Sequence, residues 1–150
     1  MGVLSNLTEE MKSAMRAKDS LKLESLRAIK TAVLLTQTAG SGRGELSDDD
    51  AIKLLQRLVK QRKESAAIFN QQNRADLAES EEAQADVIMT FLPKQLSEEA
   101  IKIVIDEIIY KTAAVSMKDM GKVMGMASIQ LLGKADGKMI ASLVKQKLST

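Results

Sequence analysis

The chain has 150 residues, carries a net charge of +2 at pH 7, and is 45% hydrophobic and 28% charged. This composition is that of an ordinary globular protein, long enough for one domain or two small subdomains. The absence of cysteine and histidine excludes disulfides, the usual zinc sites and the usual nucleophile–base pairs. We therefore expect no cofactor, no metal and no catalytic activity.

The N-terminus and the hydropathy of the chain bear on where the protein acts. The chain turns acidic and amphipathic within its first ten residues, which is not the pattern of a signal peptide. No apolar run reaches the roughly 18 residues that a membrane-spanning helix needs. We expect a cytoplasmic protein that does not enter a membrane.

Helical periodicity begins close to the N-terminus. Apolar residues at helical spacing run from Leu4 to Met15, and Asp19 or Ser20 can cap a second helix. The segment 39–47, AGSGRGELS, predicts a loop, since its glycine spacing fits no phosphate-binding motif.

A long helix is predicted next. Ser47, followed by the aspartates 48–50, predicts its start, because carboxylates are favourable at the positive end of the helix dipole. The apolar pattern ends near Asn70, and QQNR at 71–74 predicts a turn. Another helix is expected over 76–91.

Pro93 separates the two halves of the chain. Beyond it, Ser97 predicts the start of a helix with an isoleucine-rich stripe over 101–109. Ser116 and Asp119 resemble a capping box for the next helix. No strand is convincing, so the sequence predicts an all-α fold.

Two charged residues interrupt the apolar stripes of the predicted helices over 51–69 and 76–91. Arg62 and Glu81 each fall where the period requires an apolar residue. In an antiparallel hairpin they lie at similar depth, so we predict a partly buried structural ion pair that sets helix register.

The opposite face of the same long helix carries a row of basic residues, Lys53, Arg57, Lys60 and Lys63, with Arg74 just beyond. Phosphate contacts use such rows, although a solvated surface gives the same pattern. Both interpretations stay open.

The segment 116–148 has a net charge of +4 and carries Gly121 and Gly125 inside a helical pattern. A glycine inside a helix costs about 0.5–1 kcal/mol relative to alanine, so this pair predicts close backbone packing. Basic charge beside close packing favours docking onto a large anionic partner.

The stretch GKADGK, residues 133–138, joins the last two predicted helices. It is too short for a Walker A loop, and Met139 replaces the required Ser or Thr. Gly133 can end one helix, and Lys134 and Lys138 flank the first N–H groups of the next, where an anion can bind. In the competing interpretation, Asp136 caps these N–H groups itself.

The chain resembles the YqeY proteins, stand-alone relatives of the tail domain of the B subunit (GatB) of the glutamyl/aspartyl-tRNA amidotransferase. Two departures occur: Gln84 stands where that family usually has an acid, and Ser128–Ile129 replace a Met-Pro-like step. The matching stretches span almost the whole chain in the expected order: EEMKSAMRAKD, SLRAIKTA, KQRKES, NRADLAESE, FLPKQLSEEAI, DMGKVMG and GKADGK.

The resemblance implies two helical parts, residues 1–92 and a smaller tail-like part at 93–150. It also implies tRNA binding without catalysis, because the amidotransferase chemistry belongs to other domains. Partners implied are tRNA and amidotransferase or translation components, with no DNA and no membrane. The positions carried over as RNA-facing candidates are Gly121, Gly125, Gly133, Gly137, Lys122, Lys134 and Lys138.

Two functional hypotheses follow, a non-catalytic tRNA-binding accessory module and a helical protein-interaction adaptor that does not bind RNA. Phe69, Phe91 and Tyr110 are the only aromatic residues and are scattered, so stacking on bases is not expected. Phosphate contacts must therefore dominate any RNA binding. A carboxylate-based hydrolase or ligase is a third, weaker hypothesis.

Overall fold

The computed structural model describes residues 2–39 and 46–149. These residues form seven α-helices and one short 3₁₀ helix, and no β-strand occurs among them. The predicted all-α fold is confirmed. The chain divides into two compact units, Met1–Leu92 and Pro93–Thr150.

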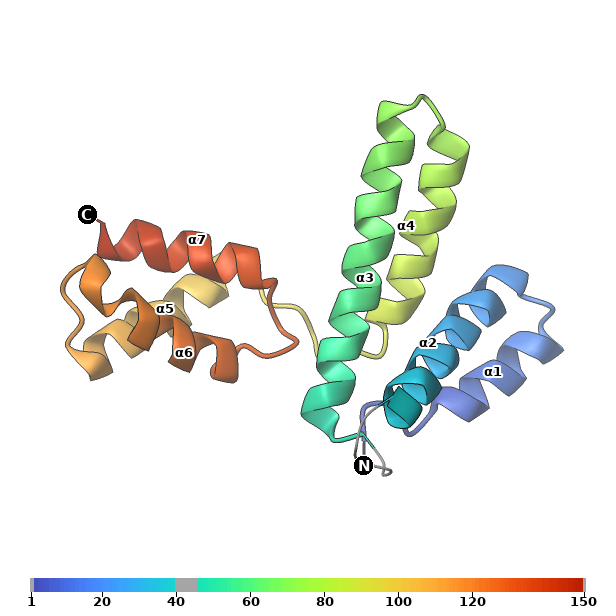
Figure 1. Cartoon of the computed structure of the whole chain (residues 1–150), viewed down its shortest axis with the longest axis horizontal. Helices are drawn as coiled ribbons and strands as arrows, with labels where there is room; N and C mark the ends of the chain where they lie inside the picture. Colours follow the sequence, from blue (N-terminus) through green and yellow to red (C-terminus); the bar gives the residue numbers. More distant parts are fainter. Residues whose placement is uncertain (1, 40–45, 150) are drawn as a thin grey trace. The chain divides into compact units, whose positions relative to one another are not determined.

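The first unit contains α1 (Leu7–Arg16), α2 (Ser20–Ala39), α3 (Asp48–Gln71) and α4 (Ala75–Met89). Helices α3 and α4 form an antiparallel hairpin, while α1 and α4 both pack on α2 (Figure 1). The core of this unit is built from apolar residues on all four helices. Its fully buried members are Leu26, Ile29, Leu55 and Ile88.

Short polar side chains fix where α2 and α3 begin. The Lys22 N–H donates to the Asp19 carboxylate at 3.1 Å, which makes Asp19 the cap of α2. The Asp50 N–H donates to Ser47 Oγ at 3.2 Å, so the start of α3 is confirmed. The loop expected over 39–47 lies mostly outside the described residues.

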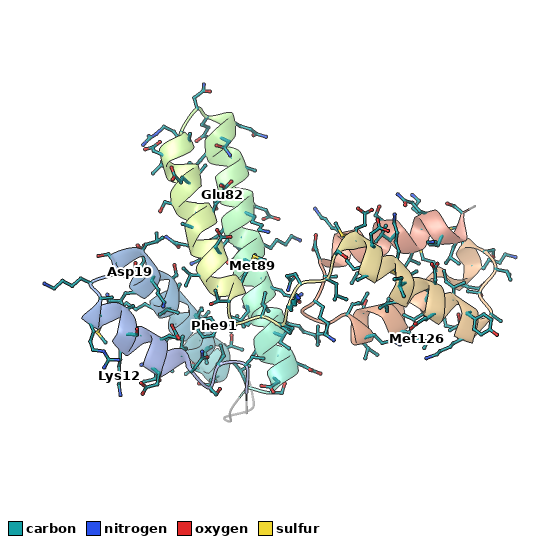
Figure 2. The ribbon with its side chains drawn as sticks, turned by 180° about the vertical axis from the view of Figure 1, so that it is seen from behind. Lys12, Asp19, Glu82, Met89, Phe91 and Met126 are labelled. Atoms are coloured by element: carbon teal, nitrogen blue, oxygen red, sulfur yellow. The ribbon has the colours of Figure 1, made fainter. Side chains whose placement is uncertain are left out.

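The hairpin turns at Asn73, whose φ of 60° is a left-handed conformation that asparagine tolerates well. Arg74 and Asp76 then form an exposed ion pair at 3.1 Å. Helix α4 ends at Met89, two residues earlier than expected. Phe91 follows it and is buried in the core of this unit (Figure 2).

The second unit contains α5 (Glu98–Thr112), the 3₁₀ helix η1 (Met117–Asp119), α6 (Met120–Gln130) and α7 (Gly137–Leu148). Helices α5, α6 and α7 pack against one another in pairs. Their shared core is wholly aliphatic, with Ile105, Val123, Ala127 and Val144 fully buried. The helices of the described chain include none long and apolar enough to cross a membrane.

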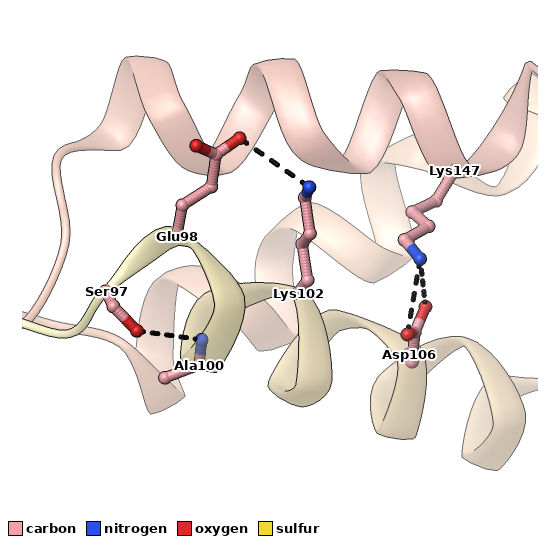
Figure 3. A network of polar contacts seen from close by, with 6 residues as sticks. All are labelled: Ser97, Glu98, Ala100, Lys102, Asp106 and Lys147. Atoms are coloured by element: carbon pink, nitrogen blue, oxygen red, sulfur yellow. Dashed lines mark hydrogen bonds and ion pairs between the residues drawn. The ribbon is translucent and has the colours of Figure 1, made fainter.

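Polar contacts at the surface of the second unit position α5 (Figure 3). Ser97 Oγ accepts a hydrogen bond from the Ala100 N–H at 3.2 Å, which confirms the predicted start of α5. The Asp106 carboxylate on α5 pairs with the Lys147 amine on α7 at 3.1 Å. Such exposed pairs contribute little stability, so the aliphatic core holds these helices together.

Candidate nucleic-acid interface

The basic candidate residues are exposed and form no ion pairs within the described residues. Not one of them forms an ion pair with a carboxylate in the ranges 2–39 and 46–149, where the observed pairs use other cations. Their charges are therefore available to an external anion. They are Lys53, Arg57 and Lys60 in the first unit and Lys122, Lys134 and Lys138 in the second.

The first unit presents its candidates on α3. Lys53, Arg57 and Lys60 are exposed along one helix, as predicted. A straight row on a 24-residue helix can follow a phosphate backbone. A solvated surface would have the same geometry, so the row alone does not decide its function.

The predicted ion pair between Arg62 and Glu81 is not formed, and this expectation is wrong. The Arg62 Nε donates to Gln84 Oε1 at 3.2 Å, and its guanidinium also donates to the Leu58 carbonyl at 3.3 Å. Glu81 and Gln84 are three residues apart on α4, so a small rotation of that helix selects the partner. Arg62 is half-buried between α3 and α4 and acts as a structural contact.

The start of η1, which leads directly into α6, is capped by its own side chains. Ser116 Oγ accepts from the Lys118 N–H at 3.3 Å, and the Asp119 carboxylate accepts from the N–H groups of Val115 at 2.9 Å and Ser116 at 3.3 Å. The predicted capping box is confirmed. The Val115 and Ser116 N–H groups hold the pKa of the Asp119 carboxyl below its ordinary value.

Gly121 and Gly125 do not serve close helix packing, and that expectation is also wrong. Both glycines are exposed on α6, and a Cβ placed on either would meet nothing within 4 Å. Helix α6 packs through Val123 and Ala127 instead, which lie on its other side. The exposed Lys122 adjoins Gly121 on this helix.

The joint between α6 and α7, residues 131–136, has a fixed backbone. Gly133 has a φ of 78°, which residues with a side chain rarely adopt. Helix α6 ends at Gln130 with Leu131 at its C-cap, so Gly133 lies in the turn that follows and does not end the helix as expected. Leu131 and Ala135 are buried and attach the joint to the core. Lys134 is exposed beside them.

The start of α7 is open. Asp136 stands at the N-cap position in an extended conformation, but its side chain accepts no hydrogen bond from the first turn. The interpretation in which Asp136 caps this helix with its carboxylate is therefore wrong. Gly137 and Lys138 are exposed and no side chain caps their N–H groups, and the exposed Lys134 precedes them in the joint. This arrangement favours an anion.

The structure separates the candidates of the second unit into two groups. Gly121, Lys122 and Gly125 lie in the first half of α6, whereas the joint follows its last residue. At 1.5 Å per residue, Lys122 is about 12 Å along the axis from the end of α6. A single small ligand cannot contact both groups, but an extended polyanion can.

Two residues beside the joint, Gln95 and Leu96, were not among the sequence-predicted site residues. The Gln95 side-chain amide donates to the Gly133 carbonyl at 2.6 Å, and the Leu96 N–H donates to the Lys134 carbonyl at 2.9 Å. No local pattern indicates these contacts, because the Gln95 contact joins residues 38 positions apart. Their one sequence signal is the FLPKQLSEEAI stretch, which lies among the resemblance motifs.

Metal-assisted chemistry has no support in the residues described. No group of three or more Asp or Glu side chains within residues 2–39 and 46–149 is placed to hold a metal ion. The second unit carries exposed lysines and, at the start of α7, N–H groups that no side chain caps.

Comparison with known proteins agrees with the resemblance. "Altered inheritance of mitochondria protein 41, mitochondrial" of Clavispora lusitaniae is 33% identical over 90 residues, 60% of this chain and 51% of that protein. The protein of the same name in Vanderwaltozyma polyspora is 26% identical over 148 residues, 94% of this chain and 79% of its own length. The chain spans about half of the length of several such relatives.

A further relative is a subunit of the glutamyl-tRNA(Gln) amidotransferase of Thermococcus gammatolerans. It is 40% identical over 57 residues, which are 35% of this chain and 9% of that protein. The family model described as "Yqey-like protein" matches residues 4–148, almost the entire chain. The chain therefore belongs to the YqeY-like protein family.

Proposed function

We propose that this chain is a non-catalytic tRNA-binding module, accessory to tRNA-dependent amidation. The observation that carries the proposal is the open start of α7, where unpaired lysines flank N–H groups that no side chain caps. Phosphate oxygens are the ligands that such an arrangement favours. The proposed partners are tRNA and amidotransferase or translation components.

The similarity to a subunit of a glutamyl-tRNA(Gln) amidotransferase supports the choice of tRNA. The other relatives are named for the inheritance of mitochondria, and those names state no chemistry. The description "mitochondrial" belongs to those relatives. A cytoplasmic location for this chain stays a prediction.

Binding of this kind relies on phosphates and shape. Tyr110 is the only aromatic residue of the second unit, so bases have no cluster of rings on which to stack. Phosphate contacts release counterions, so affinity must fall steeply as salt rises. DNA offers the same phosphates, so a DNA duplex serves as a comparison ligand.

Fluorescence anisotropy of labelled tRNA with the full chain, measured from low to physiological salt, tests this proposal. Lys134→Ala and Lys138→Ala should each lower the slope of log affinity against log salt by about 1. Lys111→Ala is the matched control, because Lys111 is an exposed lysine at the far end of α5 that lacks an ion pair with any described carboxylate.

Absence of tRNA binding at low salt contradicts the proposal. Binding that is equally strong in Lys134→Ala, Lys138→Ala and Lys111→Ala contradicts the assignment of the joint. DNA binding as tight as tRNA binding would replace the proposed partner by nucleic acid in general.

A protein-interaction adaptor is the second candidate function. The observation that favours it is the exposure of large apolar side chains in the second unit, with Tyr110 88%, Val115 84% and Ile129 79% exposed. A protein partner on this surface would bind with little dependence on salt, in contrast to tRNA. The same titration series, run with a purified amidotransferase, distinguishes the two.

A further inference from the structure

Helix α5 carries two large apolar side chains on the face that points away from the core of the second unit. Ile103 is 60% exposed and Tyr110 is 88% exposed. The two residues are two turns apart, opposite the buried stripe of Ile101, Ile105 and Ile108. Within the described residues of the second unit, no other helix exposes two large apolar side chains by more than half. The pair thus differs from the single apolar residues that any protein surface exposes.

Carboxylates flank this apolar pair. Glu99 lies one turn before Ile103 and Glu107 lies one turn after it, at the spacing that places side chains next to each other on a helix. Both glutamates are exposed, and neither forms an ion pair with a described lysine or arginine. The ion pairs of α5 use other carboxylates (Figure 3). These four residues, Glu99, Ile103, Glu107 and Tyr110, are called the outer face of α5.

Tyr110 is the residue of the outer face that gains most from a partner. Its ring is the largest apolar group on this face, and its hydroxyl makes no hydrogen bond with a described residue. Tyrosine buries a large area at a low cost in side-chain entropy, and it is frequent among the residues that contribute most to protein–protein binding. The outer face therefore has the composition of a protein-binding surface.

Charge determines which kind of partner fits the outer face. Its two free carboxylates repel the phosphates of RNA and of acidic lipids, and a symmetric contact with a second copy of α5 would bring like charges together. The backbone groups of α5 bond within the helix, so a partner cannot add as a strand. An amphipathic helix with lysine or arginine beside its apolar stripe matches both the apolar pair and the acids. From Glu99 to Tyr110 the face is about 17 Å long, which is three turns of such a helix.

We propose that the outer face of α5 is a docking site for a basic amphipathic helix of a protein partner. Ile103 and Tyr110 pack against the apolar stripe of that helix, and Glu99 and Glu107 pair with its cations. The inference does not rest on tRNA binding, because none of these residues belongs to the basic candidates of the RNA surface.

The unsubstituted full chain gives the first test, because Tyr110 is its single tyrosine and it has no tryptophan. Tyrosine fluorescence therefore reports on the outer face alone. The probe is a synthetic helix of about 14 leucines and lysines with the leucines on one face, and its control has glutamate in place of lysine. The lysine helix should protect Tyr110 from quenching by acrylamide, whereas the glutamate helix should not. Absence of protection by the lysine helix overturns the proposal.

A charge reversal tests the role of the carboxylates. In fluorescence anisotropy with the labelled lysine helix, Glu107→Lys should weaken binding about fivefold. Glu82→Lys makes the same change of charge at an exposed position on α4 (Figure 2) and should weaken binding less than about twofold at physiological salt. Equal losses in the two variants overturn the proposal, because the probe would then respond to net charge alone.

Loss of the ring tests the apolar part of the outer face. Tyr110→Ser should weaken binding of the lysine helix at least about fivefold. Ile129→Ser is the matched control, because it removes a 79% exposed apolar side chain from α6 and should leave binding unchanged. Equal affinities of Tyr110→Ser and Ile129→Ser for the lysine helix overturn the assignment.

Other occupants of the outer face give different results. If acrylamide quenching of Tyr110 falls as the chain alone is concentrated, a second copy covers the face and the proposal is overturned. If Tyr110→Ser weakens the binding of labelled tRNA, RNA covers the face and the proposal is overturned as well. Unchanged tRNA affinity together with loss of helix binding in Tyr110→Ser supports it. Absence of tRNA binding by the unsubstituted chain counts against the proposed function alone.

Discussion

Two helix starts in the second unit, those of η1 and α7, look alike in sequence but are built differently. At the start of η1, which leads directly into α6, the Ser116 hydroxyl accepts from the Lys118 N–H, and the Asp119 carboxylate accepts from the Val115 and Ser116 N–H groups just before the turn. At the start of α7, Asp136 stands in the cap position and its side chain bonds to no N–H group of the first turn. A short polar residue before a helix therefore marks the start of the helix without deciding whether its N–H groups are occupied.

This difference ranks the candidate anion sites. Around the start of η1, the Lys118 N–H bonds to the Ser116 hydroxyl and the Val115 and Ser116 N–H groups bond to the Asp119 carboxylate, whose negative charge lies near Lys122. The N–H groups at the start of α7 are open, and Lys134 and Lys138 flank them. The joint is thus the better site for a phosphate.

Gly133→Ala is expected to lower stability most, because Gly133 has a left-handed backbone conformation in the joint that leads to α7. A left-handed conformation costs a residue with a side chain about 1–2 kcal/mol, so urea unfolding should show a loss of that size. Gly137→Ala is the matched control, since a Cβ there meets nothing within 4 Å. Equal losses in both variants would show that the φ of Gly133 is not the cause.

Ser116→Ala tests the capped start of η1, which leads into α6. Loss of the hydroxyl that accepts from the Lys118 N–H should lower the free energy of unfolding by about 1 kcal/mol. Ser128→Ala, at an exposed position within α6, should leave stability unchanged or slightly raised. Thermal unfolding followed by circular dichroism measures both, and a neutral Ser116→Ala would contradict the capping role.

Gly125→Ala tests whether the exposed face of α6 is free of packing contacts. Because nothing packs against Gly125, alanine should stabilise the helix by about 0.5–1 kcal/mol. Gly121→Ala should act in the same direction but less, because it lies in the first turn. A loss of stability in urea unfolding of either variant would show that a neighbour does pack on that face.

The pH dependence of stability is expected to be the smallest effect. The pKa of the Asp119 carboxyl is lowered in the folded chain, mainly by the Val115 N–H. Its contribution is therefore complete above the ordinary aspartate pKa and is lost as the pH falls below that value toward the folded pKa. Urea midpoints measured from about pH 7 to about pH 3 should fall less steeply in Asp119→Asn than in the unsubstituted chain.

Asp136→Asn is the matched control for Asp119→Asn at about pH 7. The Asp136 side chain accepts no hydrogen bond from the first turn of α7, so its substitution should leave the urea midpoint at about pH 7 nearly unchanged. If Asp136→Asn lowers that midpoint as much as Asp119→Asn, the two helix starts do not differ as described.

Local sequence was enough to place most helix starts. Ser47, Ser97 and Ser116 were expected to cap helices, and each accepts a hydrogen bond from the turn that follows it. These contacts join residues only two or three positions apart, so nearby chemistry determines them. The end of α4 was misplaced by two residues, because Phe91 enters the core and its burial outweighs the helical pattern.

The sequence could not show which of several nearby residues on a helix contacts a neighbouring helix. Arg62 bonds to Gln84 rather than Glu81, and the rotation of α4 against α3 makes that choice. Gly125 faces outward for the same kind of reason, since the packing of α6 on α5 and α7 determines which face is buried. Periodicity gives the faces of a helix but not their partners.

By itself, the sequence determined that the protein is all-α and where most of its helices begin. It also showed that the chain has no cysteine or histidine. The tertiary structure alone decided that the start of α7 is open and that Gln95 and Leu96 bond to the joint. Helix caps depend on residues close in the chain, whereas those contacts join residues 38 positions apart that only packing of the core brings together.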